Sequence, residues 1–116
     1  MSGAVGLFCG ANDTVPDTFR EAAAAFGRGL AARGLTLVYG GSSRGLMGEA
    51  ARAARAAGGR VIGVMPRHLV GRERVAADID ELHLVDSLAE RKQRMADRSD
   101  FFVALPGTRT DGGRFV

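Results

Sequence analysis

Four short apolar runs, each followed directly by glycine or proline, most constrain the fold of this 116-residue chain. The runs are continuous rather than alternating, which is the pattern of strands buried on both faces of a parallel sheet. They cover Ala4–Cys9, Leu35–Tyr39, Arg60–Met65 and Phe101–Leu105, and His83–Val85 is a briefer fifth candidate. The sequence therefore predicts an all-parallel sheet with its connections passing over both faces.

Helical periodicity fills the segments between these runs. Thr14 is the expected N-cap of the first helix, and Ser87 with Glu90 forms a capping box for the last. The expected helices run from Pro16 to Gly34, from Gly45 to Ala57 and from Ser87 to about Arg98. This alternation predicts a doubly wound, Rossmann-like α/β sheet of three layers, in a single domain over residues 1–116. Ligands of such sheets bind at the carboxyl ends of the strands.

Composition narrows the class of partner. Hydrophobic residues make up 46% and charged residues 25%, as in ordinary globular domains. The sequence has neither a long apolar run nor a signal-peptide pattern, so a cytoplasmic protein without membrane contact is expected. The net charge is +3, yet tryptophan is absent and aromatics total 6%. Stacking partners for bases are therefore scarce, and no nucleic-acid partner is predicted.

The stretch from Val38 to Gly48 has the layout of a phosphate site, because glycines and hydroxyls separate a strand from a helix. Its candidate binding residues are Gly40, Gly41, Ser42 and Gly45. The glycines fit neither the dinucleotide fingerprint nor the P-loop, which disfavours a nicotinamide enzyme or an ATPase. An alternative is that they are turn residues and nothing more.

The helix after Ser87 carries two cations on the same stripe as Leu88 and Met95. The stripe consists of Leu88, Arg91, Lys92, Met95 and Ser99. In one interpretation, Arg91 and Lys92 point into a cleft. In the other, the helix packs through Leu88, Ala89 and Ala96 while its cations extend into solvent.

The other reactive side chains are isolated. Cys9 ends an apolar run and is interpreted as a core residue, with a catalytic thiol as the alternative. His68 and His83 have no partner at metal-ligand spacing, so both are expected at the surface and no metal site is predicted. Pro106 and Gly107 form a turn at the ligand edge of the sheet, which a structural role also explains.

Taken in order, these segments resemble the cytokinin riboside 5'-monophosphate phosphoribohydrolases, the "lonely guy" family often mislabelled as lysine decarboxylases. The match covers nearly the whole chain. It is carried by Phe8-Cys9-Gly10, Val38 to Gly48, Val61 to Pro66, Glu90 to Met95 with Ser99-Asp100, and Ala104 to Gly107. The decarboxylase label itself is rejected, because pyridoxal phosphate enzymes hold their cofactor on a lysine and Lys92 is the only lysine here.

The resemblance implies a homodimeric enzyme that hydrolyses the N-glycosidic bond of a nucleoside 5'-monophosphate, without metal or organic cofactor. Arg91 and Lys92 match the Arg-Lys pair of the family's cleft and are the catalytic candidates. Glu73 matches a substrate-contacting glutamate. The remaining substrate-binding candidates are Gly40, Gly41, Ser42, Gly45, Met95, Pro106 and Gly107.

The tail departs from the family pattern, which continues as Pro-Gly-Gly-x-Gly-Thr-x-x-Glu. Thr108 replaces the second glycine, and Gly113 and Arg114 stand where glutamates are expected. A truncation or frame change after Gly107 would produce this tail, so the domain is expected to be incomplete beyond that point and its hydrolysis impaired. Glu73 and Asp111 are the substitute carboxylates. Two alternatives are a non-catalytic nucleotide-binding remnant and a member of another Rossmann-like group.

Overall fold

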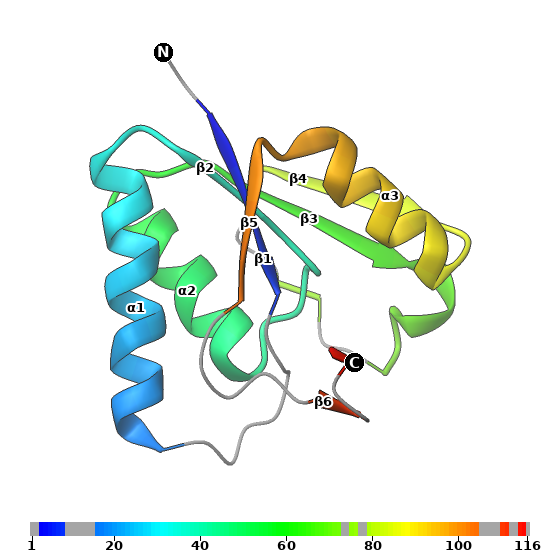
Figure 1. Cartoon of the computed structure of the whole chain (residues 1–116), viewed down its shortest axis with the longest axis horizontal. Coiled ribbons are helices and arrows are strands. Elements are labelled where there is room, and N and C mark those ends of the chain that lie inside the picture. Colours follow the sequence, from blue (N-terminus) through cyan, green and yellow to red (C-terminus); the bar gives the residue numbers. More distant parts are fainter. Residues whose placement is uncertain are drawn as a thin grey trace.

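The structure is a computed structural model that describes residues 3–8, 16–72, 75–76, 79–104, 110–111 and 114–115. Its main feature is a five-stranded sheet in the order β4-β3-β2-β1-β5, in which all neighbours are parallel (Figure 1). The strands are β1 (Ala4–Phe8), β2 (Thr36–Tyr39), β3 (Val61–Pro66), β4 (Glu81–Val85) and β5 (Phe101–Ala104). The predicted parallel sheet is confirmed.

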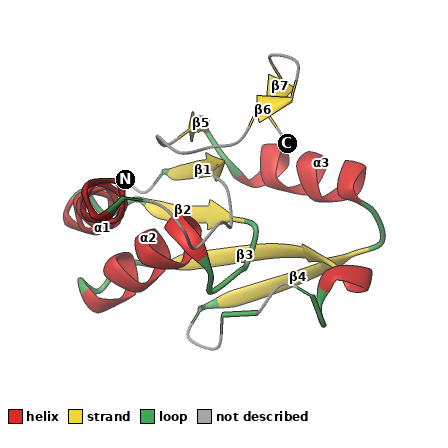
Figure 2. Cartoon of the chain, turned by 90° about the horizontal axis from the view of Figure 1, so that it is seen from below, coloured by secondary structure: helices red, strands yellow, loops and turns green. Residues whose placement is uncertain are grey.

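Helices cover both faces of this sheet. Figure 2 shows α1 and α2 on one face and α3 on the other, which gives the three predicted layers. The helices are α1 (Asp17–Ala32), α2 (Gly45–Ala56), the 3-10 turn η1 (Arg67–Leu69) and α3 (Leu88–Arg98). Two further short strands, β6 (Thr110–Asp111) and β7 (Arg114–Phe115), pair antiparallel in a separate sheet.

Two clusters of buried side chains form the core, one on each face of the sheet. Alternate residues of the central strands separate them: Leu37 and Tyr39 of β2 join the cluster under α1 and α2, while Val38 joins the one under α3. Both faces of β2 and β3 are thus apolar, which explains why these strands read as continuous apolar runs. Within the described residues, no helix is long and apolar enough to cross a bilayer.

Two predicted starts were wrong by two residues. The N-cap residue of α1 is Pro16, not Thr14, which lies outside the described residues. The Pro16 carbonyl accepts hydrogen bonds from the amides of Phe19 and Arg20, at 3.0 and 3.3 Å, so the helix starts directly after the proline. Strand β4 begins at Glu81 rather than His83. As an edge strand it alternates polar and apolar residues, and the charged Glu81 concealed its start.

Candidate functional site

The loop after β2 is buried and depends on glycine backbone geometry. Gly40, Gly41 and Ser42 are all buried, and Ser42 is fully so. Gly41 has a φ of +87° and Gly45, at the start of α2, a φ of +60°. Residues that carry a side chain rarely adopt this left-handed backbone conformation, so glycine is needed at both positions. The predicted loop therefore exists as a defined turn from the sheet into α2.

Hydrogen bonds within the loop and from α2 fix the remainder of this loop. The Ser42 hydroxyl accepts from the Arg44 amide at 3.0 Å, and the Arg44 carbonyl accepts from the Gly48 amide at 3.1 Å. Arg52 Nη1 donates to the Ser43 carbonyl at 2.8 Å. The sequence gives no signal for this contact, because a spacing of nine residues fits no helical period.

The segment that follows η1 returns to the same loop. Val75 forms an antiparallel bridge with Ser42, and the Ala76 amide donates to the Gly41 carbonyl at 2.9 Å. Three predicted positions, Glu73, Pro106 and Gly107, lie outside the described residues, as does Cys9. Their assignments stay predictions.

Arg91 connects α3 to β3 and to the residue that directly follows β2. Its Nε donates to the Val64 carbonyl of β3 at 2.8 Å, and its Nη2 donates to the Gly40 carbonyl at 2.6 Å. Bonds between a charged donor and a carbonyl are stronger than neutral ones. They hold the guanidinium plane beside the glycine loop. The structure thus brings together two candidate site residues, Arg91 and Gly40, whose roles stay predictions.

The other residues of the predicted helix stripe differ in burial. Met95 is 2% exposed and packs in the core cluster under α3, whereas Leu88 is 59% exposed and Lys92 is also exposed. Neither interpretation of this helix describes it fully. Arg91 faces inward and Lys92 outward, while Leu88, Ala89 and Ala96, the packing residues of the second interpretation, are all exposed.

The sequence suggested that His83 is an isolated surface residue. In the structure it is only partly exposed and has hydrogen-bond partners on both ring nitrogens. Its Nδ1 accepts from Arg94 Nη1 at 3.0 Å and its Nε2 donates to Glu81 Oε1 at 2.8 Å, because arginine can only donate and an ionised glutamate only accept. The bond from His83, followed by one from Arg60, lowers the pKa of the Glu81 carboxyl. Among the described residues, no group of three or more His, Cys, Asp or Glu could hold a metal ion.

The arrangement can recognise an anion at the sheet's carboxyl edge, where a glycine loop, a helix start and a fixed guanidinium meet. The chain is a Rossmann-like α/β protein of the kind that binds ligands at this edge. Residues 47–109 match the family described as "possible lysine decarboxylase". The chain belongs to this family, the lonely guy family of the sequence resemblance.

Curated relatives carry phosphoribohydrolase names. The chain is 50% identical over 101 residues to a probable cytokinin riboside 5'-monophosphate phosphoribohydrolase of Oryza sativa subsp. japonica, covering 87% of this chain and 44% of the relative. It is 48% identical over 103 residues to the cytokinin riboside 5'-monophosphate phosphoribohydrolase of Mycobacterium tuberculosis, covering 89% and 54%. The chain thus spans about half the length of these relatives.

Solved structures with the same fold carry a different description. The molybdenum cofactor carrier protein of Chlamydomonas reinhardtii superposes with a TM-score of 0.78 at 27% identity, over 95% of this chain and 65% of that one. The molybdenum cofactor binding protein of Rippkaea orientalis gives 0.76 at 22% identity, over 90% and 63%, which shows the fold alone.

Proposed function

We propose that this family member hydrolyses the N-glycosidic bond of nucleoside 5'-monophosphates, including cytokinin riboside monophosphates, to a free base and ribose 5-phosphate. One observation carries the proposal. Arg91 is fixed by the carbonyls of Gly40 and Val64 beside the glycine loop, in a chain 48 to 50% identical to named phosphoribohydrolases. We also propose that it works as a cytoplasmic homodimer.

The reaction builds positive charge on the ribose as the bond to the base breaks, and water then adds to the sugar carbon. A carboxylate that faces this charge lowers the activation free energy by about 2.7 to 4 kcal/mol, by analogy with other groups placed for developing charge. In this chain, Glu73 and Asp111 are the proposed substitutes for the motif glutamates. Arg91 and Lys92 are proposed to hold the substrate, with loop amides from Gly40 to Gly45 contacting it.

Base release from AMP and from isopentenyladenosine monophosphate, followed by chromatography, tests this function. The 116-residue chain is compared with a version whose tail is rebuilt to the family pattern. We expect much slower release by the shorter chain, because Thr108, Gly113 and Arg114 replace motif residues. Release by neither version would contradict the proposed function for these two substrates.

Variants of the rebuilt version test the individual roles. We expect Arg91→Ala to lower base release at least about tenfold, since each 1.36 kcal/mol of lost transition-state stabilisation is tenfold in rate. Arg33→Ala is the matched control, because Arg33 also donates to a backbone carbonyl, that of Gly29 at 3.1 Å, at the far end of α1. Equal activity of Arg91→Ala and Arg33→Ala would remove Arg91 from the site.

A second candidate function is nucleotide binding without catalysis. It is favoured by the altered tail and by the 27% identity to a protein named as a cofactor carrier. In that case nucleoside monophosphates would raise the melting temperature of the chain while no base appears, because a ligand that binds only the folded state stabilises it. An unchanged melting temperature would contradict this candidate.

A further inference from the structure

The glycine loop, residues 40–45, lies directly on β3 at Gly63. A Cβ added at Gly63 would lie 2.8 Å from the Gly41 Cα and 3.0 Å from Ile79 Cδ1. Real Cβ atoms essentially never come closer than 3.0 Å to such neighbours, so a side chain at this position would force the two backbones apart. Glycine weakens the interior of a strand, and there it often marks a place where another backbone approaches closely. The other residues of β3 are Val, Ile, Met and Pro, so Gly63 is the position that admits the loop.

Hydrogen bonds hold the loop in place around this contact. The Ala76 amide donates to the Gly41 carbonyl at 2.9 Å, and Arg91 Nη2 donates to the Gly40 carbonyl at 2.6 Å. These donors come from the segment before β4 and from α3. Because Gly40 and Gly41 are adjacent in the chain, a shift of Gly41 away from Gly63 would also move the carbonyl that Arg91 holds.

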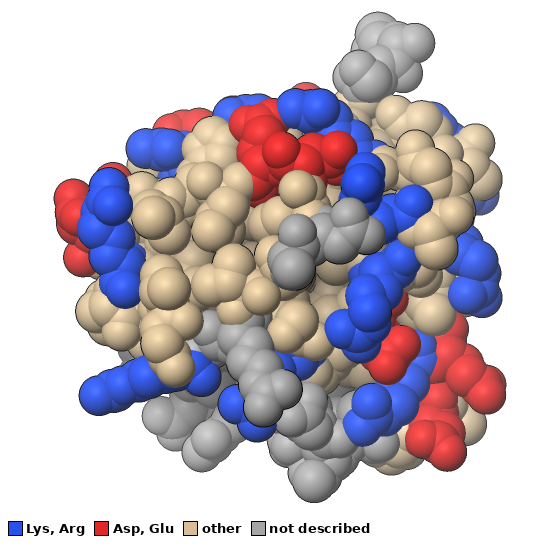
Figure 3. Space-filling model, turned by 180° about the vertical axis from the view of Figure 1, so that it is seen from behind, with Lys and Arg blue, Asp and Glu red and all other residues tan. Residues whose placement is uncertain are grey.

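The position of the loop matters because its backbone amides are groups that can receive an anion. On the face of the molecule shown in Figure 3, acidic and basic side chains lie beside one another. The ion pairs Arg55–Asp80 and Arg60–Glu81 have this form. A guanidinium that is paired with a carboxylate offers little excess charge to a ligand, and a backbone amide cannot extend toward one as a long side chain can. A small displacement of the loop is therefore expected to change affinity.

We propose that Gly63 is a positioning residue of the candidate site. Its lack of a side chain lets the loop lie at the depth at which the loop amides and Arg91 meet a nucleoside 5'-monophosphate. Gly63 acts through Gly41 and does not touch the ligand itself. The identity of the ligand rests on the proposed function, whereas the contact between Gly63 and the loop does not.

The first test needs no ligand and compares amide chemical shifts of ¹⁵N-labelled 116-residue chains. We expect Gly63→Ala to shift the amides of Gly40 and Gly41 and the Nε–H of Arg91. Gly59→Ala is the matched control, because a Cβ there would lie 2.9 Å from a backbone oxygen of α2 but at the other end of β3. The same loop shifts in both variants would refute the proposal. Sucrose, which favours the folded state, is added to all samples so that both variants are compared folded.

A double variant separates the two contacts of the added methyl group. Valine lacks the Cδ1 of isoleucine, so in Gly63→Ala/Ile79→Val only the contact with Gly41 remains. We expect this double variant to keep the loop shifts of Gly63→Ala. A return to the wild-type shifts would show that Ile79, and not the loop, transmits the substitution, and would overturn the proposal.

The second test titrates AMP into the same chains by calorimetry. We expect Gly63→Ala to weaken AMP binding at least about tenfold, the factor for roughly 1.4 kcal/mol, and Gly59→Ala to bind like the wild type. An equal loss in both variants would indicate a merely structural role, and loop shifts with unchanged AMP affinity would also refute the positioning role. A wild-type chain that binds no AMP would contradict nucleotide binding at the candidate site, while the ligand-free shifts still decide whether Gly63 positions the loop.

Discussion

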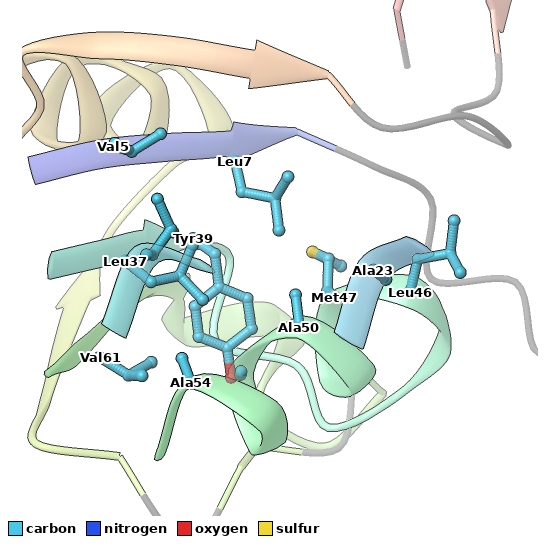
Figure 4. Packing of buried hydrophobic residues seen from close by; sticks show 12 residues of the cluster. Val5, Leu7, Ala23, Leu37, Tyr39, Leu46, Met47, Ala50, Ala54 and Val61 are labelled. Carbon is cyan, nitrogen blue, oxygen red and sulfur yellow. The ribbon is translucent and has the colours of Figure 1, made fainter. Parts of the chain in front are cut away.

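Tyr39 is a buried polar residue whose hydroxyl has no hydrogen-bond partner within the described part of the chain. Figure 4 shows its ring in the core cluster with the hydroxyl directed toward α2, near Ala54. Burial raises the pKa of the Tyr39 phenol, and the positive charge of Arg52 opposes that shift only in part. Removing water from an unpaired hydroxyl is unfavourable by about 1 to 3 kcal/mol, so Tyr39→Phe is expected to keep or raise the stability of the fold.

The same residue predicts how stability depends on alkaline pH. The unfolded phenol ionises near pH 10, at its ordinary pKa, while the folded one stays neutral to higher pH. Above about pH 10 the unfolded state therefore binds fewer protons than the folded state, and stability falls as pH rises. Tyr39 is the only tyrosine and tryptophan is absent, so ultraviolet absorbance reports its ionisation directly.

We expect the tyrosinate signal to appear together with alkaline unfolding, and Tyr39→Phe to lose less stability between pH 9 and pH 12. Urea titrations at each pH measure this. Ionisation of Tyr39 near pH 10 in a chain that stays folded would contradict the prediction.

Single residues also show where sequence reasoning reached its limit. The glycine loop was predictable, because left-handed backbone at Gly41 and Gly45 requires glycine. The partners of Arg91 were not, because its acceptor carbonyls lie 27 and 51 residues away and any residue type supplies a carbonyl. Local patterns contain nothing about such contacts, which depend on how the chain closes.

At the scale of elements, α1 and α2 make the closest approach between helices. A Cβ added at Gly27 would lie 2.2 Å from the Ala50 carbonyl oxygen of α2, whereas one at Gly29 would meet only the end of the Arg33 side chain, at 3.3 Å. The Ala50 backbone cannot move aside as the flexible Arg33 side chain can. The two glycines of one helix therefore have opposite expected responses to substitution.

We expect Gly27→Ala to lower the free energy of unfolding by about 1 to 3 kcal/mol, the usual effect of overpacking. Gly29→Ala is the control and should raise it by up to about 1 kcal/mol, because alanine favours helix over glycine. Chemical denaturation measures both values. Equal effects of the two substitutions would show that helix propensity, not contact with α2, decides the outcome.

The capping box of α3 gives a second prediction at this scale. The Ser87 hydroxyl accepts from the Glu90 amide at 3.0 Å, and Glu90 Oε2 accepts from the Asp86 amide at 3.0 Å. We expect Ser87→Ala to destabilise the chain by about 1 kcal/mol and Ser87→Asp to restore most of that loss, since aspartate also caps helices. Thermal unfolding of both variants checks this, and a neutral Ser87→Ala would contradict it.

The sequence predicted which segments are helices and strands more reliably than which side of a helix is buried. The capping residues placed α3, and its helical spacing was correct, yet the buried side carries Arg91 and Met95 while Leu88 is exposed. Hydrophobicity alone could not choose that side. The sheet offers carbonyl acceptors to a cation there, and an arginine is buried only when such partners exist.

At the scale of the whole molecule, β5 is an edge strand with β1 as its only partner in the described sheet. Phe101 is 57% and Phe102 43% exposed, on opposite faces of that strand. Open edges with apolar side chains pair with other chains.

We expect the 116-residue chain to associate with itself as its concentration rises, and Phe101→Lys to reduce that association, since charge on an edge strand opposes pairing. Sedimentation velocity over a concentration series measures it. Leu88→Lys is the matched control, because Leu88 is 59% exposed but lies on α3. An equal reduction by both variants would indicate general surface hydrophobicity rather than the strand edge.

The parallel arrangement of the strands has a consequence for how such a molecule evolves. Residues that stabilise the layers lie between sheet and helices, while the Gly40 to Gly45 turn lies where the strands end. In such folds the loops at the strand ends choose the ligand, and the packed layers supply the stability. One ancestral scaffold of this type is therefore compatible with descendants as different as a named phosphoribohydrolase and a named cofactor carrier.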